Sequence, residues 1–172
     1  WKSGHSNWML SPAQVVPVVT QGRVFFVSSD CFTTVLDETT GKVIWRYNDP
    51  DNRVRESIGL SQDGNTVYAK TMDGKVMAID AREPVRKVKW ISSGEDMGYE
   101  LAPTPVVEHD GVVYAPTDKG LIYAYRATDG VFLWNYRIST GLITMILPSE
   151  NGDLYVSAMD GKITRLTKHK RP

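Results

Sequence analysis

Tryptophan recurs along this chain at a nearly constant spacing, and that period constrains the fold more than any other feature of the sequence. Separations of 44, 45 and 44 residues divide four of the five tryptophans, Trp1, Trp45, Trp90 and Trp134, and only Trp8 lies outside this spacing. The flanking residues repeat too, because segment 22–45 aligns without a gap on segment 111–134. A repeat of this length that holds several short strands is the sequence pattern of a β-propeller blade, a four-stranded antiparallel sheet.

Turn dipeptides divide each repeat into short strands. Asp-Gly or Asn-Gly, which tolerate the positive φ angles of tight hairpins, begins at positions 63, 73, 110, 129, 151 and 160. The runs between them are rich in Val, Ile, Tyr, Phe and Thr, which suit a pleated, half-buried surface. No stretch of ten or more residues shows a clear helical period. We therefore predict an all-β chain, a β-propeller of four-stranded antiparallel blades with about four blades present.

The repeat divides residues 1–172, which we take as one domain, into successive blades. They are expected at about 14–47, 56–91, 102–137 and 142–167, and the fourth shows only three strands. Trp1 stands at the closing position of a blade whose other strands do not precede it. Two explanations fit. The chain is part of a longer propeller, or segment 1–10 closes the fourth blade, within one chain or in a symmetric homodimer of half-rings. We favour the first.

A motif near the end of each repeat resembles that of a known family. Segment 35–45 reads Val-Leu-Asp-Glu-Thr-Thr-Gly-Lys-Val-Ile-Trp, and segment 124–134 follows the same pattern with a few substitutions. The pattern resembles the repeat of the pyrroloquinoline-quinone-like (PQQ-like) β-propellers, and the resemblance covers nearly the whole chain. Closed rings in that family usually hold more than four blades, which favours a partial or half propeller here.

The resemblance implies structural roles for the repeated residues. In the family, a Thr-Gly pair turns the third strand of a blade into the fourth, and the following tryptophan packs against the neighbouring blade. The residues to which we assign this blade-docking role are Trp1, Trp45, Trp90, Trp134, Gly41 and Gly130. Cys31 stands where the other repeats carry glycine, so we expect a different turn in the first blade.

No combination of residues points to catalysis. The chain has three histidines and one cysteine, and it lacks the Gly-x-Ser-x-Gly, P-loop and His-Glu-x-x-His motifs. Its 20 basic and 20 acidic residues balance, which disfavours nucleic acid as a partner. No apolar run reaches the ~20 residues of a membrane span. We therefore expect no catalytic residue, no cofactor and no metal ion.

The resemblance implies a binding function. Cofactor-free members of the family include the lipoprotein scaffold of the outer-membrane barrel-assembly machinery, a periplasmic protein that presents one propeller face to protein partners. We therefore predict a non-catalytic scaffold, periplasmic or secreted, with a protein partner. Loops that lead into the blades are expected to form its binding face, with the candidates Arg55, Glu56, Tyr99 and Glu100. The alternatives are part of a PQQ-dependent quinoprotein dehydrogenase, or a sensor or accessory domain of a larger enzyme such as a phosphoesterase or kinase.

Overall fold

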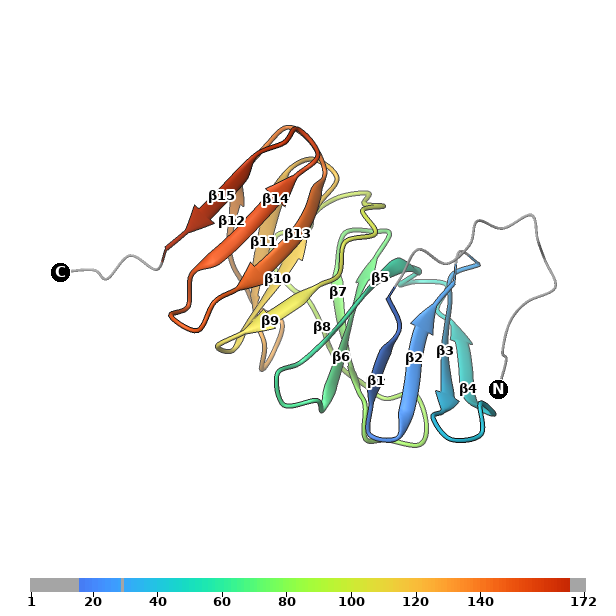
Figure 1. The fold of residues 1–172 in the computed structure, drawn as a ribbon. Coiled ribbons are helices and arrows are strands. Elements are labelled where there is room, and N and C mark those ends of the chain that lie inside the picture. Colours follow the sequence, from blue (N-terminus) through green and yellow to red (C-terminus); the bar gives the residue numbers. More distant parts are fainter. Residues whose placement is uncertain (1–15, 29, 168–172) are drawn as a thin grey trace.

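The computed structural model describes residues 16–28 and 30–167, and the regular elements within them are β-strands (Figure 1). The strands are β1 (Val18–Thr20), β2 (Arg23–Val27), β3 (Phe32–Asp37), β4 (Val43–Asn48), β5 (Val54–Leu60), β6 (Thr66–Thr71), β7 (Val76–Asp80), β8 (Val88–Ile91), β9 (Val107–His109), β10 (Val112–Pro116), β11 (Leu121–Arg126), β12 (Phe132–Arg137), β13 (Ile143–Pro148), β14 (Leu154–Ala158) and β15 (Ile163–Leu166). In this part of the chain, no helix has the length and hydropathy needed to cross a membrane.

The strands form four separate sheets, which contain β1–β4, β5–β8, β9–β12 and β13–β15. Each sheet is an antiparallel meander, because its strands pair in the order in which they occur in the chain. The fourth sheet has three strands within the described residues. The prediction of an all-β propeller built from successive antiparallel blades is confirmed, and we refer to the sheets as the first to the fourth blade.

Equivalent residues occupy equivalent places in the strand registers of the four blades. The second strand carries an aromatic residue opposite the third strand, in the pairs Phe25–Val35, Tyr68–Ala78, Tyr114–Ala124 and Tyr155–Arg165. In the first three blades, the repeated tryptophan lies opposite that same third-strand residue, just before a bulge. One tryptophan period in the sequence therefore corresponds to one blade.

The blades stack face to face, and the apolar core lies between them. Separate clusters fill the three interfaces, one around Phe25, one around Tyr68 and one around Ile122. Figure 1 shows the result as an arc of sheets, with the first and fourth blades at its opposite ends. We call the side of a sheet that faces the next blade in the chain its leading face, and the opposite side its trailing face.

The first strands of neighbouring blades approach one another closely. A Cβ atom on Gly59 of β5 would lie 1.7 Å from the carbonyl oxygen of Val106, so only glycine fits there. Buried hydroxyl groups also join these segments. The Oγ of Ser57 donates to the carbonyl of Thr104 at 2.7 Å, and the Oγ1 of Thr104 donates to the carbonyl of Ile143 in the next blade. Backbone contact, as well as apolar packing, thus sets the spacing of the blades.

The turn between β2 and β3 corrects one expectation from the sequence. Cys31 adopts a φ of +64°, in the same left-handed region as Gly74 at +81° and Gly161 at +81°. Its N–H donates to the carbonyl of Ser28 at 2.9 Å, matching the bond from Gly74 to Thr71 at 3.1 Å. The expectation of a different turn in the first blade is therefore wrong. A cysteine takes the glycine conformation there, at a steric cost that glycine avoids.

Candidate functional site

Trp90, on β8, joins the second blade to the third. Its indole Nε1 donates a hydrogen bond of 2.9 Å to the carbonyl oxygen of Ala127, in the turn between β11 and β12. The ring lies beside Tyr68 of its own blade, with 5.7 Å between the ring centroids. Gly130 belongs to the same turn as Ala127, and a Cβ atom there would lie 2.4 Å from a carbon of the Trp90 ring. The indole therefore fills the seam between the blades, and the receiving turn has no room for a side chain.

Gly41 and Gly130 occupy corresponding turns between the third and fourth strands of their blades. Their φ angles are +69° and +74°, in the left-handed region that favours glycine. In the first blade the carboxylate of Asp37 accepts hydrogen bonds from the backbone N and the Oγ1 of Thr40, both at 2.6 Å. These hydrogen bonds lower the pKa of Asp37. The Asp-x-x-Thr-Gly motif of the sequence is thus a turn motif, which positions the strand that carries the tryptophan.

The other repeated tryptophans have different surroundings. Trp45, on β4, lies edge to face against Phe25 of β2, with 6.3 Å between the ring centroids. It also packs against the apolar cluster between the first and second blades. Trp134, on β12, lies beside the tyrosine of β10 at 6.0 Å, but 37% of its surface is exposed. By strand register, the sequence positions of the fourth blade that correspond to Ala127 and Gly130 are 168 and 171. Those residues and Trp1 lie outside the described part of the chain.

Tyr99 is exposed on the loop between β8 and β9, one of the loops expected to form a binding face. Its side chain is 58% exposed, whereas Met97 and Glu100 on either side of it are buried. The N–H of Met97 donates to the carbonyl of Gly74 at 2.9 Å, and the N–H of Glu100 donates to the carbonyl of Met72 at 3.0 Å. The loop is therefore fixed to the β6–β7 turn of its own blade. Exposed tyrosines are enriched at the energetic centres of protein interfaces, and a fixed loop has less conformational freedom to lose on binding.

The other candidates from the sequence were Arg55, Glu56 and Glu100, and of these Glu100 does not lie with Tyr99 on an exposed surface. Arg55 and Glu56 lie on β5, where the pairing with β6 is irregular. Arg55 is half-buried, and the side chain of Glu56 lies outside what the structure describes. Glu100 is only 2% exposed. The structure thus places Glu100 in the interior, because its carboxylate serves a buried ion pair.

That ion pair links Glu100 to Lys70 of β6. The Nζ of Lys70 lies 3.4 Å from the Oε1 of Glu100, and the two side chains are 2% and 0% exposed. The Nζ also donates to the carbonyl of Pro116 at 2.6 Å. The carboxylate accepts the backbone N–H groups of Ala102 at 2.7 Å and Asp118 at 3.0 Å. Burial lowers the pKa of Lys70 to about 8 and raises the pKa of Glu100. The polar partners stabilise both charges in a place where isolated charges would be very costly.

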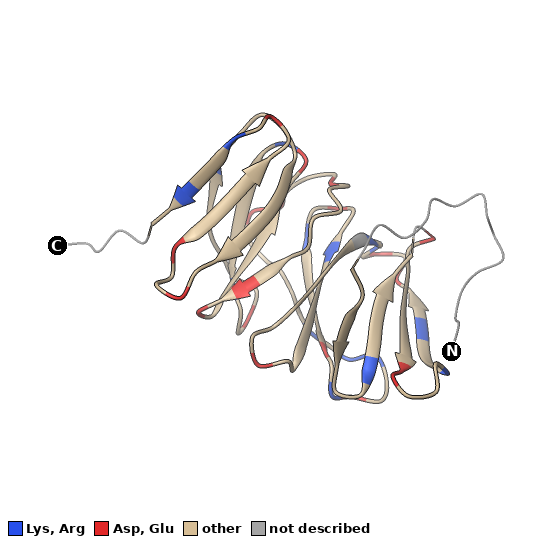
Figure 2. Ribbon diagram, viewed as in Figure 1, with Lys and Arg blue, Asp and Glu red and all other residues tan. Residues whose placement is uncertain are grey.

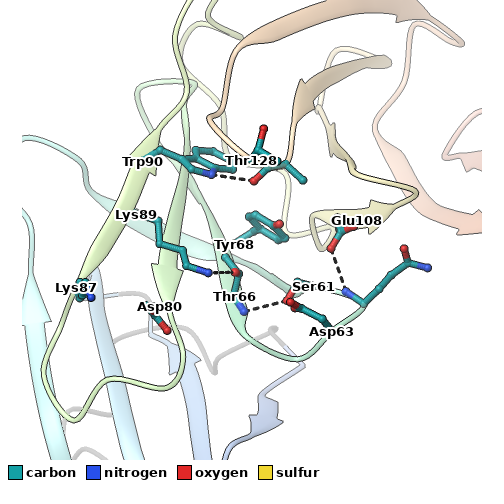
Figure 3. A pocket seen from close by; sticks show the side chains of 12 residues that line it. Ser61, Asp63, Thr66, Tyr68, Asp80, Lys87, Lys89, Trp90, Glu108 and Thr128 are labelled. Atoms are coloured by element: carbon teal, nitrogen blue, oxygen red, sulfur yellow. Dashed lines mark hydrogen bonds between the residues drawn. The ribbon is translucent and has the colours of Figure 1, made fainter.

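A groove of about 750 Å³ opens along the seam between the second and third blades (Figure 3). Its lining comprises Ser61, Gln62, Asp63, Thr66, Tyr68, Asp80, Lys87, Lys89, Trp90, Glu108, Ala127 and Thr128. The Nζ of Lys89 donates to the Oγ1 of Thr66 at 2.6 Å on one side. On the other side, the backbone N–H of Gln62 donates to the carboxylate of Glu108 at 3.0 Å and thereby bridges the two blades.

Charges of both signs line the groove and are held by protein partners. Hydrogen bonds from Ser61 and Asn65 lower the pKa of Asp63 to about 2. Burial raises the pKa of Tyr68, and the charges of Glu108 and Asp63 raise it further. This mixture selects no particular ionic ligand, so we assign no ligand to the groove.

The described residues contain no group of three or more His, Cys, Asp or Glu side chains placed to hold a metal ion. Cys31 is a half-buried free cysteine whose Sγ lies 3.8 Å from the Sδ of Met72. Sequence reasoning missed the partner of Glu100. The signal that could have found it is Lys70 itself, a charged residue in the middle of β6, whose six residues are all buried.

The stacked antiparallel blades and the tryptophan repeat define the class of this protein, a β-propeller of PQQ-like repeats. A family described as "Outer membrane protein assembly factor BamB" matches residues 1–90 and 84–171. The chain belongs to that family.

Comparisons with individual proteins agree with this assignment. The outer membrane protein assembly factor BamB of Escherichia coli K12 is 25% identical over 162 residues, which cover 92% of this chain and 38% of that protein. The quinoprotein alcohol dehydrogenase PedH of Pseudomonas putida is 26% identical over 137 residues, 70% of this chain and 22% of the enzyme. The crystal structure of BamB from Moraxella catarrhalis superposes with a TM-score of 0.70 at 16% identity, over 91% of this chain and 46% of that one. The chain therefore spans less than half the length of these relatives.

Proposed function

We propose that this chain is a non-catalytic scaffold that binds protein partners during outer membrane protein assembly, in the periplasm of a bacterium, as part of a larger propeller. The observation that carries the proposal is the family match, which extends over both halves of the chain. The named function of the Escherichia coli relative supplies the process. A scaffold requires a rigid face and no reactive centre. The loop between β8 and β9, which is hydrogen-bonded to the β6–β7 turn, supports such a role.

The loop face around Tyr99 is the part of the molecule that we propose for partner contact. Tyr99 combines an exposed aromatic ring with a loop that is hydrogen-bonded on both sides. Nearby, the Nζ of Lys119 donates to the carbonyl of Tyr99 at 3.2 Å, and Arg53 pairs with Asp73 at 3.5 Å. Figure 2 shows acidic and basic residues scattered over all four blades rather than gathered in one region. An aromatic centre with mixed charges around it suits a protein partner better than a polyanion.

Photo-crosslinking from the loop face tests this proposal. We expect a photoreactive amino acid at Tyr99, in cells that contain the outer membrane assembly proteins, to form a covalent adduct with one of those proteins. The matched control is Val85, which is 63% exposed in the turn between β7 and β8, at the opposite end of β8 from the loop of Tyr99. Adducts at Tyr99 and not at Val85 would support the proposal. Equal labelling at both positions, or none with assembly proteins, would contradict it.

A second candidate function is favoured by one specific observation, the match to quinoprotein alcohol dehydrogenases of Pseudomonas putida. In this alternative the chain is part of a PQQ-dependent enzyme. The match covers only 22% of the PedH enzyme. The two proteins can therefore have similar blades without having the same active site. A sensor or accessory domain of a larger enzyme is the remaining alternative, and the same stacked blades would serve it.

A further inference from the structure

The loop between β8 and β9 carries Tyr99 from the second blade to the third, and it is attached to both. On the second blade, the N–H groups of Met97 and Glu100 donate to the β6–β7 turn, as described above. On the third blade, the Nζ of Lys119 donates to the carbonyl of Tyr99 at 3.2 Å, and the N–H of Asp118 donates to both carboxylate oxygens of Glu100, at 3.0 and 3.2 Å. Tyr99 therefore lies where two blades hold the loop at once.

The two ends of the loop have attachments of their own. Near its start, the N–H of Ser93 donates to the carbonyl of Gly130 at 3.0 Å, and the hydroxyl of Tyr125 donates to the carbonyl of Glu95 at 3.1 Å. Near its end, Thr104 is hydrogen-bonded to both β5 and β13. A loss of the contacts around Glu100 would therefore free only a short part of the loop. We call this part, residues 96–101, the Tyr99 segment.

Three ionisable groups meet where the Tyr99 segment docks. Lys70 comes from the second blade, Glu100 from the loop and Asp118 from the third blade, and the Nζ of Lys70 lies 3.4 Å from the Oε1 of Glu100. The Oδ1 of Asp118 is buried, and it accepts no hydrogen bond from a residue that the structure describes. Burial raises the pKa of Glu100, Lys70 lowers it, and the side chain of Asp118 raises it again. The carboxyl group of the loop thus lies beside a like group on the third blade.

We propose that Lys70 is a positioning residue for the partner-binding loop, because its ammonium group holds Glu100 beside Asp118 and thereby fixes the Tyr99 segment. The Nζ of Lys70 also donates to the carbonyl of Pro116 in β10 at 2.6 Å, so one cation joins the second blade, the third blade and the loop. Two carboxylates that share a buried place without a cation repel each other. Without Lys70, the Tyr99 segment is therefore expected to detach while the blades stay stacked through their own apolar clusters.

Amide hydrogen exchange, followed by NMR on the intact chain at one fixed pH, measures this detachment at Met97 and Glu100. In Lys70→Met we expect both amides to exchange about tenfold or more faster than in the unmodified chain, because hydrogen bonds to charged groups stabilise by at least that factor. If Lys70→Met does not fold, Glu100→Gln takes its place, since it keeps the volume and one acceptor oxygen while removing the charge. Exchange as slow as in the unmodified chain would overturn the proposal.

Leu154→Ala is the matched control for a general loss of stability. Leu154 is 2% exposed and lies at the start of β14, in the fourth blade. Its truncation destabilises the fold without touching the loop, so we expect the amides of Met97 and Glu100 to exchange as in the unmodified chain. Equal acceleration in Leu154→Ala and Lys70→Met would overturn the proposal, because the loop would then open only when the whole fold unfolds.

The double variant Lys70→Met/Asp118→Asn tests the role of the charges. Asp118→Asn removes the like charge and keeps the backbone N–H that binds Glu100. We therefore expect the two loop amides to exchange more slowly in the double variant than in Lys70→Met. Exchange that is equally fast in both would overturn the proposal, since repulsion between the carboxylates would then not be what releases the loop.

The consequence for partner binding rests on the proposed function, whereas the exchange measurements do not. Photo-crosslinking from Tyr99 is expected to give fewer adducts in Lys70→Met than in the otherwise unmodified chain, and more again when Asp118→Asn is added. Undiminished adducts despite faster exchange would overturn the positioning role of Lys70. Faster exchange in Lys70→Met, with no adducts even when Lys70 is present, would support the effect on the loop and contradict the proposed function instead.

Discussion

Replacing Trp90 by alanine is expected to lower the free energy of unfolding by about 3 kcal/mol, at the lower end of the range for deleting a packed indole. The variant loses the hydrogen bond to the carbonyl of Ala127 and the contact with Tyr68. It also leaves a void beside Gly130, which the chain cannot fill without moving the turn. In a chain of this length the melting temperature should fall by roughly 6–12 °C. Differential scanning calorimetry measures both quantities.

Trp134→Ala is the matched control for this prediction. Trp134 belongs to the same repeat position, but it is 37% exposed, and its indole donates no hydrogen bond to a residue that the structure describes. We expect its loss to cost less than half as much as the loss of Trp90. Trp90→Phe should fall between the two, because it keeps an aromatic ring and removes only the donor. Equal costs for Trp90→Ala and Trp134→Ala would show that the seam with Ala127 does not hold the blades together.

Breaking the buried ion pair is expected to be as damaging as losing Trp90. Lys70→Met leaves Glu100 buried beside the Asp118 backbone and side chain with no cation, and we expect a cost of about 3 kcal/mol or more. Glu100→Gln should cost less, because Lys70 keeps the carbonyl of Pro116 and remains near Asp118. Urea unfolding measures these differences, provided that the dependence of the unfolding free energy on urea concentration is the same for all variants.

The double variant Lys70→Met/Glu100→Gln distinguishes a charge effect from a packing effect. Removing both charges leaves neither one unpaired, so we expect the double variant to be more stable than Lys70→Met alone. The control pair is Lys87–Glu83, at 2.8 Å with side chains 56% and 36% exposed. Lys87→Met should leave the free energy of unfolding nearly unchanged, because water screens this pair. If the loss of stability in the double variant equals the sum of the losses in Lys70→Met and Glu100→Gln, the ion pair is not the reason for either loss.

The fold was predictable from the sequence because the blade is repeated. Four of the five tryptophans are separated by nearly equal distances, and the turn dipeptides divide each interval into strands. Gly41 and Gly130 were recognisable from their place in the repeated motif, and both adopt a positive φ in the structure.

The details of the interior were less accessible to sequence reasoning. Glu100 was placed on a binding loop because loops are usually exposed, and the sequence does not show that its carboxylate turns inward to Lys70. That pairing depends on two segments 30 residues apart in different elements. The conformation of Cys31 was also missed, because a cysteine at a glycine position predicts a changed turn, whereas the surrounding hydrogen bonds impose the same one.

A binding scaffold and a quinoprotein enzyme differ in whether they bind pyrroloquinoline quinone and oxidise an alcohol. An absorbance titration of the purified chain with pyrroloquinoline quinone and calcium distinguishes the two most directly. We predict no saturable change in the quinone spectrum and no reduction of a dye acceptor when an alcohol is added. Saturable binding of one quinone per chain or per ring, with alcohol-dependent dye reduction, would contradict the account and make the enzyme alternative the correct one.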